Sequence, residues 1–267
     1  MIRTAVFLSL IAGSAAAQDR IPSHCIALAQ GPERLWQAGF GDPLEADHVR
    51  LRYIDHATFL LETSGGLLAA TDYTGYLGVQ DVVPDVVTMN NAHSTHWTSD
   101  PDPRIPHVLR GWAQGGLPAW HELDLGEMLV RNVTTDVRSR FGDDSRGDGN
   151  SIFIFEVAGL CIGHLGHLHH VPDAAQFASI GRLDVLMVPV DGGYTMTVAD
   201  MADVVRRLRS SVVIPMHWFS GASLEVFLTE MAGEFEVVRL EEPELELSLD
   251  RLPGRPTIMV MPPQFLE

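Results

Sequence analysis

Histidines cluster after three apolar segments of this chain, in the sequences NNAHSTHW, HLGHLHH and IPMHW. Each apolar segment is typical of a buried strand, and loops at strand ends are where α/β folds place their sites. Neutral imidazole is the commonest protein ligand of zinc-like ions, and a site needs three or four such groups from separate segments. A single histidine is more often a hydrogen-bonded core residue, so the prediction of a metal site rests on all three segments together. The histidines concerned are His93, His96, His164, His167, His169, His170 and His217.

Hairpins are predicted ahead of the first histidine cluster. Residues 49–63 alternate between apolar and polar side chains, and a Ser-Gly-Gly turn joins them to the segment 67–73. A short buried strand at 84–89 then leads into the cluster. Residues 97–120 are rich in Pro, Gly and Trp without a clean period, which predicts an irregular segment that forms a lid or wall of the site.

The second half of the chain alternates strands with helices. Strands are expected at 150–166 (two strands), 184–190, 211–218 and 257–263, with a loop and edge strand at 240–250. Apolar residues at helical spacing predict helices over 197–210 and 224–235, the first capped by Thr197. Hairpins in the first half and strands alternating with helices in the second half favour sheets packed on one another with helices outside. This is an α/β layered fold in one domain.

Six segments occur in an informative order: YIDHATFLLET, TDY, PDVVTMNNAHSTHW, GLCIGHLGHLHH, DVLMVPVDGGYTM and VVIPMHW. With these segments the chain resembles the metallo-β-lactamase fold superfamily over Val49 to Phe219, in particular the branch similar to L-ascorbate-6-phosphate lactonase and other Zn-dependent hydrolases. The resemblance implies a four-layer αββα sandwich with metal at the edge of the sheets. It also implies that the metal activates water to attack an ester, lactone, amide or phosphodiester.

By this resemblance, the family signature His-x-His-x-Asp-His falls on residues 91–96. His93 and His96 match its second and last histidines. Asn91 and Thr95 stand where the family has its first histidine and its aspartate, and we expect both beside the metal or the substrate.

Three later positions follow the same comparison. His164 fits the family's His-x-Gly-Asp motif, but His167 occupies the place of the aspartate that bridges two ions. His217 matches the final metal histidine, and Arg138 stands near an expected mid-chain histidine. Because four family ligands are replaced, a dinuclear site is not expected.

We expect one metal ion per chain, zinc in the first place, because three histidines and a water make a competent zinc site. Its predicted ligands are His93, His96, His167 and His217, with His164 and His169 in reserve. If four histidines closed the shell, the ion would be structural, since no position would be open to substrate. Asp191 or Asp72 would accept the proton during hydrolysis.

Several neighbouring residues have two interpretations. His56 either lies at the site or orients a ligand through a hydrogen bond, and the second is favoured. Asp72 matches an acidic residue that supports the metal loop in the family, whereas Asp191 is a ligand, a base or a turn residue. Arg138, with Arg140, forms an anion-binding wall or pairs with acidic residues on the surface.

Charge excludes several classes of function. The chain has 267 residues and a net charge of −17, with 35 acidic residues against 18 basic residues, none of which is lysine. Such a surface repels nucleic acid and anionic membranes, and the lack of lysine excludes Schiff-base and P-loop chemistry. The expected partner is a small-molecule substrate.

Residues 1–17 place Arg3 ahead of a short apolar run and a small-residue stretch, a pattern typical of a cleaved secretory signal. The mature domain would be 18–267, periplasmic or secreted, and free of the membrane. In an oxidising compartment, Cys25 and Cys161 either form a disulfide or remain buried thiols, and the sequence leaves both open.

An exported metal-dependent hydrolase is the first functional hypothesis. The second is a degenerate family member that binds a ligand or metal without turnover, because fold and function are separable. The third is redox chemistry, since a site of histidines also accepts copper or iron. The identity of the metal and an open coordination position distinguish the three.

Overall fold

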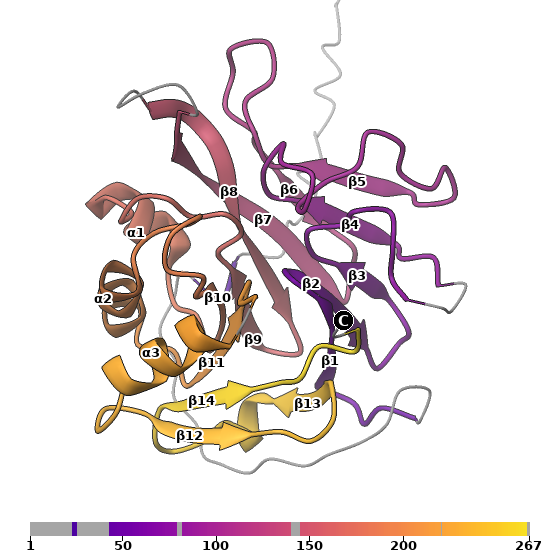
Figure 1. The fold of residues 1–267 in the computed structure, drawn as a ribbon. Helices are drawn as coiled ribbons and strands as arrows, with labels where there is room; N and C mark the ends of the chain where they lie inside the picture. The colour runs from indigo at the N-terminus through magenta and orange to yellow at the C-terminus, as the bar shows by residue number, and fades with distance from the viewer. Residues whose placement is uncertain (1–22, 26–42, 79–81, 140–144, 220, 266–267) are drawn as a thin grey trace, which may run out of the picture.

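Two mixed β-sheets pack face to face in the computed structural model, which describes residues 23–25, 43–78, 82–139, 145–219 and 221–265 (Figure 1). The first sheet has the strand order β13-β1-β2-β3-β4-β5, and the second has the order β12-β14-β11-β10-β9-β8-β7-β6. The strands of the first sheet are β1 (His48–Asp55), β2 (Thr58–Thr63), β3 (Leu68–Ala70), β4 (Val86–Met89), β5 (His107–Arg110) and β13 (Glu244–Ser248). Those of the second sheet are β6 (Glu122–Asp124), β7 (Met128–Arg138), β8 (Ser145–Val157), β9 (Leu160–His164), β10 (Val185–Pro189), β11 (Val212–Met216), β12 (Glu236–Arg239) and β14 (Thr257–Val260). The predicted signal segment lies outside the described residues.

Apolar side chains between the two sheets form the central core. Alternation along β1 directs Val49, Leu51 and Tyr53 into this core, in agreement with the sequence pattern. Phe153 and Phe155 of β8 meet them from the second sheet. The core therefore fixes the two sheets against each other, and with them the strand ends that carry the histidines.

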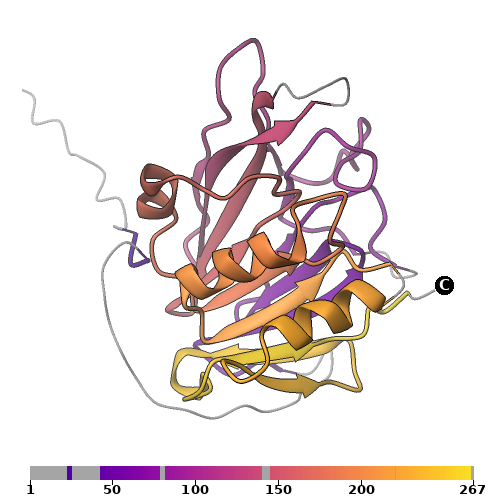
Figure 2. The same cartoon turned by 60° about the vertical axis from the view of Figure 1, so that its left-hand side comes forward.

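Helices cover the outer face of the second sheet (Figure 2). They are α1 (Ala174–Ile180), α2 (Val198–Leu208) and α3 (Ala222–Glu230), and a short 3-10 turn follows at Leu249–Arg251. The predicted start of α2 is confirmed, because the Thr197 side chain accepts a hydrogen bond from the backbone N–H of Asp200. No helix in the described part of the chain is long and apolar enough to cross a membrane.

Loops cover the outer face of the first sheet over the part of the chain that the structure describes. Ile54 and Met89 of the strands belong to the same buried cluster as Ile105 of the loop before β5. Pro101 and Pro103 lie in this loop, and proline disrupts the interior of a helix. The α/β sandwich of the resemblance is confirmed, whereas the helical layer expected on this face is formed by loops among these residues.

Other elements differ from the sequence-based expectation. β5 lies within 97–120, the segment predicted to be irregular, and neither β7 nor α1 was predicted. β7 pairs antiparallel with β8 along its length. Pairing with this neighbour stabilises β7 as a strand, although its own sequence pattern does not predict one.

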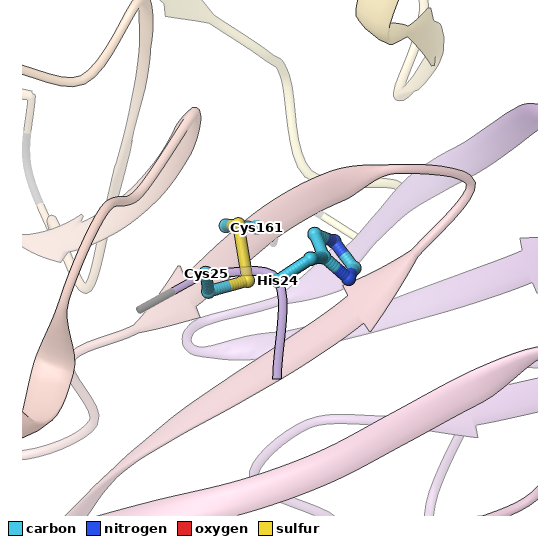
Figure 3. A group of neighbouring side chains, drawn as sticks. All are labelled: His24, Cys25 and Cys161. Carbon is cyan, nitrogen blue, oxygen red and sulfur yellow. A yellow bond between two sulfur atoms is a disulfide. The ribbon is translucent and has the colours of Figure 1, made fainter. Parts of the chain in front are cut away.

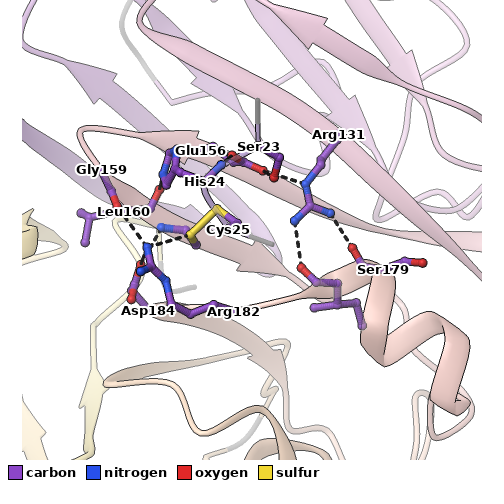
Figure 4. The surroundings of a disulfide bond; sticks show 12 residues. Ser23, His24, Cys25, Arg131, Glu156, Gly159, Leu160, Ser179, Arg182 and Asp184 are labelled. Carbon is purple, nitrogen blue, oxygen red and sulfur yellow. Dashed lines mark hydrogen bonds and ion pairs between the residues drawn. A yellow bond between two sulfur atoms is a disulfide. The ribbon is translucent and has the colours of Figure 1, made fainter. Parts of the chain in front are cut away.

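A disulfide joins Cys25 to Cys161 of β9 across a sequence separation of 136 residues, which decides between the two alternatives for these cysteines (Figure 3). His24 lies beside the bond, but both sulfur atoms are used and are not available as metal ligands. The backbone N–H of Arg182 donates to the Cys25 carbonyl at 2.8 Å, and that of His24 donates to Glu156 Oε2 at 3.0 Å (Figure 4). Together these contacts fasten residues 23–25 to the second sheet.

Replacing Cys25 and Cys161 by serine should lower the free energy of unfolding by about 2–4 kcal/mol, because the cross-link restricts the unfolded chain. Urea denaturation of the wild type and the double variant measures the difference. A reducing agent should destabilise the wild type to the same extent and leave the double variant unchanged. Equal stability of the oxidised wild type and the double variant would contradict the role assigned to the bond.

Candidate metal centre

A cavity of about 1190 Å³ opens where the ends of several strands meet. Its wall is built by the segments after β4, β9, β10 and β11, by the β1–β2 turn, by the end of β7 and by the start of β8. Strand ends from both sheets contribute, so segments far apart in sequence reach one place. The three histidine-bearing segments of the sequence come together at this cavity.

His96 and His217 face each other with their Nε2 atoms 3.2 Å apart. Behind each ring lies a buried carboxylate: Asp72 Oδ2 is 2.6 Å from His96 Nδ1, and Asp191 Oδ2 is 3.0 Å from His217 Nδ1. The contact of His96 is a hydrogen bond, whereas Asp191 Oδ2 lies close to His217 Nδ1 outside hydrogen-bond geometry. A carboxylate oxygen only accepts, so the nearby Nδ1 is the favoured place for each ring proton, and with the proton there each Nε2 keeps a lone pair. Two lone pairs at this distance repel each other unless a cation or proton lies between them.

This pair of nitrogens fits a transition metal ion. In a tetrahedral site with Zn–N bonds of ~2.0–2.1 Å, neighbouring nitrogens are ~3.3–3.4 Å apart, close to the distance between these two Nε2 atoms. Burial, followed by repulsion from His217 and His93, keeps the pKa of His96 well below its usual value. The ring therefore stays neutral, which is the form that binds metal.

His56 brings a third nitrogen to the pair. Its ring centroid lies 3.9 Å from that of His217, and its buried Nε2 has no hydrogen-bond partner within the described part of the chain. Ligand nitrogens of His56, His96 and His217 all lie within 4.8 Å of one another. Burial, then repulsion from His217 and His96, lowers the pKa of His56 to about 2. Sequence reasoning favoured an orienting role for His56, whereas the structure places it with the ligand nitrogens.

The backbone of His56 also ties the two sheets together at the site. Its carbonyl accepts hydrogen bonds from the Tyr53 hydroxyl at 2.7 Å and from the backbone N–H of His217 at 2.8 Å. The β1–β2 turn is thereby held against the end of β11.

His93 and His167, the other two predicted ligands, line the cavity beside these three histidines. Their rings stack with centroids 5.4 Å apart, and the His167 ring lies 4.6 Å from that of His96. His167 Nδ1 is buried and has no hydrogen-bond partner in the described ranges. Burial, followed by repulsion from the neighbouring histidines, lowers the pKa of His167. His93 Nδ1 lies 3.0 Å from the Thr95 hydroxyl.

His164 and His169, the two histidines predicted as reserve ligands, use ring nitrogens in hydrogen bonds. His164 Nε2 donates to the Ala57 carbonyl at 2.8 Å, and Nδ1 accepts from the backbone N–H of Gly166 at 3.2 Å. His169 Nδ1 accepts from the backbone N–H of Arg138 at 2.7 Å, so its Nε2 carries the proton. In these tautomers neither ring offers a lone pair to a metal.

Asp72 and Asp191 lie behind the histidines and not among the residues that line the cavity. Asp72 is fully buried, and its Oδ1 accepts from the backbone N–H of Asn90 at 2.7 Å. Burial raises the pKa of Asp72 to about 7. Burial also works to raise the pKa of Asp191, but the close contact with His217 and hydrogen bonds from Thr195 hold it below its usual range. Both carboxylates thus lie where they can orient the histidine rings, and their role as proton acceptors stays a prediction.

Three residues of the centre adopt left-handed backbone conformations. The φ angles are 47° for His56, 41° for Asp72 and 59° for His217. Such a conformation in a residue other than glycine costs about 1–3 kcal/mol and is found most often at functional sites. The surrounding sheets hold these strained turns in place.

Arg138 links the end of β7 to the loop after β10. Its Nη2 donates to the carbonyls of Gly193 and Tyr194 at 2.9 Å each, and the side chain lines the cavity. Among the described residues, the side chain of Arg138 donates to carbonyl groups, which differs from the surface ion pair considered above. Arg140 lies outside the described residues. Asn91 also lines the cavity and forms an isolated β-bridge with Asn150.

Comparison with known proteins gives relatives along most of the chain. A UPF0173 metal-dependent hydrolase of Opitutus terrae is 26% identical over 208 residues, which are 70% of this chain and 92% of the relative. A UPF0173 protein of Pyrococcus furiosus is 23% identical over 196 residues, covering 68% of this chain and 90% of the relative.

Solved structures show the same fold. A Zn-dependent hydrolase of the metallo-beta-lactamase superfamily from Thermotoga maritima matches 81% of this chain and 100% of its own, with 27% identity and a TM-score of 0.59. A metal-dependent hydrolase from Parabacteroides distasonis matches 69% of this chain and 89% of its own, with 16% identity and a TM-score of 0.55. The model of the beta-lactamase superfamily domain matches residues 50–217. The resemblance seen in the sequence is thus confirmed at the level of the superfamily, and this chain belongs to the beta-lactamase superfamily.

Proposed function

We propose that this chain is a hydrolase that uses one transition metal ion held by His56, His96 and His217. The observation that carries the proposal is the pair of lone-pair nitrogens 3.2 Å apart, each ring fixed from behind by a carboxylate. Several relatives carry names that call them metal-dependent or Zn-dependent hydrolases, and these names support the proposal. Nitrogen donors suit zinc, copper and nickel better than magnesium or calcium, so zinc is proposed first. His93 and His167 remain predicted as further ligands.

When bound, such an ion supplies Lewis acidity to the substrate and to a water molecule, which suits hydrolysis of a small ester, lactone, amide or phosphodiester. The chain itself keeps the proton on Nδ1 of His96 and His217 through Asp72 and Asp191, and this fixes each tautomer. The cavity of about 1190 Å³ is large enough for a small-molecule substrate.

We also propose that the protein is exported to the periplasm or secreted. The apolar N-terminal pattern supports this, and so does the disulfide between Cys25 and Cys161, because such bonds persist in oxidising compartments.

Binding without turnover is the second candidate function. It is favoured by Asn91, Thr95 and His167, which stand where the resemblance places ligands of a two-ion site. The protein would then keep the fold without hydrolysis. It would either hold a metal ion whose coordination positions are all filled by protein, or bind a ligand in the cavity without metal.

Protein purified without added metal or chelator should contain about one metal ion per chain by elemental analysis. His217→Ala should lose this ion, because it removes one of the two facing nitrogens. His107→Ala is the matched control, since His107 lies on β5 at a separate, smaller cavity.

The same measurement separates the candidates. Zinc supports the hydrolase, and copper or iron supports redox chemistry. Absence of metal, with none taken up from added zinc, supports binding without metal. Unchanged metal content in His217→Ala would show that the ligands are misassigned.

Asp191→Asn should weaken metal affinity by about 10–100-fold, because the negative charge behind His217 is lost while the ring stays in place. Competition with a chromogenic chelator measures the affinity directly, without an assay of activity. Asp203→Asn, an exposed carboxylate on α2, is the control. Equal affinities in the two variants would remove Asp191 from the metal centre.

A further inference from the structure

The wall of the site cavity has a charge opposite to that of the rest of the chain. Acidic residues number 35 in the sequence, yet no Asp or Glu is among the described residues that line the cavity. Two arginines, Arg138 and Arg146, are among them. In a chain of net charge −17, the described cavity wall is therefore locally positive.

The charge of the two arginines is not cancelled by a carboxylate within the described parts of the chain. Arg138 Nη2 donates to three neutral carbonyls, at distances of 2.5–2.9 Å. Arg146 is exposed, and its Nη2 lies 3.5 Å from the Gly149 carbonyl. A carbonyl orients a guanidinium but leaves its positive charge to act on a ligand.

His169 adds a hydrogen-bond donor to the same wall. Because its Nδ1 accepts from the backbone N–H of Arg138, its proton is on Nε2. That Nε2 is buried and has no hydrogen-bond partner among the residues that the structure describes. The His169 ring is one of the residues that line the cavity.

Two exposed aromatic rings stand beside this donor set. Tyr194 is 70% exposed and Phe219 is 60% exposed, and their ring centroids lie 5.5 Å apart. Phe219 also lies 5.5 Å from His217 and 5.2 Å from His56, so this apolar surface adjoins the candidate metal ligands. Arg138 and Asp191 hold the backbone at Tyr194 through hydrogen bonds to its carbonyl and its N–H.

We propose that the site takes a small anion that carries a ring, with its carboxylate or phosphoryl group on Arg146 and His169 and its ring on Tyr194 and Phe219. This inference rests on the proposed function, because it names the substrate class of the same cavity. A guanidinium and an imidazole N–H both donate to anionic oxygen, and aromatic faces stack with planar rings. Because Phe219 lies beside His56 and His217, a ring bound on Phe219 would lie next to the candidate metal ligands.

Calorimetric binding of four probes that the protein cannot hydrolyse tests the proposal: phenylphosphonate, benzoate, methylphosphonate and neutral benzyl alcohol. Phenylphosphonate or benzoate should bind at least about tenfold more tightly than benzyl alcohol, a factor that one charge-assisted hydrogen bond supplies. Comparison of phenylphosphonate with benzoate identifies the anion as phosphoryl or carboxylate. Comparison with methylphosphonate isolates the contribution of the ring.

Matched variants locate each part of the ligand. Arg146→Gln should weaken the two aryl anions by about tenfold and leave benzyl alcohol unchanged, whereas Arg255→Gln, an exposed arginine on the loop before β14, should have no effect. Phe219→Ala should weaken every aryl probe and spare methylphosphonate. Tyr76→Ala, an aromatic residue that is 48% exposed and does not line the cavity, is its control.

The metal content of each sample separates this inference from the proposed function. If no metal is present but aryl anions still bind through Arg146 and Phe219, the proposal of a metal-dependent hydrolase fails and the proposal of a ring-bearing anionic ligand is supported. If metal is present and Arg146→Gln binds the anions as tightly as Arg255→Gln does, the proposed anionic ligand is wrong while the proposed hydrolase is unaffected. Equal binding of benzyl alcohol and the anions, or no binding of either anion, also overturns it.

Discussion

The facing acceptor nitrogens of His96 and His217 are the constraint on which the rest of the site depends. His96 follows a strand of the first sheet and His217 a strand of the second, so the 3.2 Å contact spans the sandwich. Each ring is fixed by a carboxylate, and each carboxylate is fixed by backbone N–H groups, from Asn90 and from Thr195. Two neutral rings in this position repel, whereas a cation between them bonds both. A metal ion bound there would therefore stabilise the edge of the sandwich as well as supply chemistry.

The fold was predictable where burial sets the sequence pattern. Alternation along β1 and helical spacing along α2 both reflect one buried face, and both elements are where the sequence places them. The sequence did not predict the strands whose structure depends on pairing with a neighbouring strand. β7 owes its order to pairing with β8, and β5 owes its order to parallel pairing with β4 within a segment whose composition indicates a loop. Pairing partners of this kind leave no periodic signal in the strand itself.

At the site, the rule that functional loops follow strand ends was enough to select the histidines after β4, β9 and β11. His56 gives no such signal, because it stands alone in a hairpin turn and reaches the centre only when that turn docks against His217. The tautomers of His164 and His169 were equally hidden. They follow from hydrogen bonds to Ala57 and Arg138, residues remote in sequence, and these bonds decide which rings keep a lone pair. Residue type and spacing thus predict where imidazoles gather, and only the packed structure determines which of them can bind an ion.

The departures from the family pattern also determine the charge of the site. By the resemblance, Thr95 and His167 stand where the family has aspartates. Neutral groups at these positions leave the full charge of a bound cation directed at the substrate. The net charge of −17 works against anions at long range, but at physiological salt charges beyond ~8 Å are largely screened, so the local wall with Arg138 and Arg146 dominates. The two changes that argue against a second ion are therefore also the ones that favour an anionic substrate.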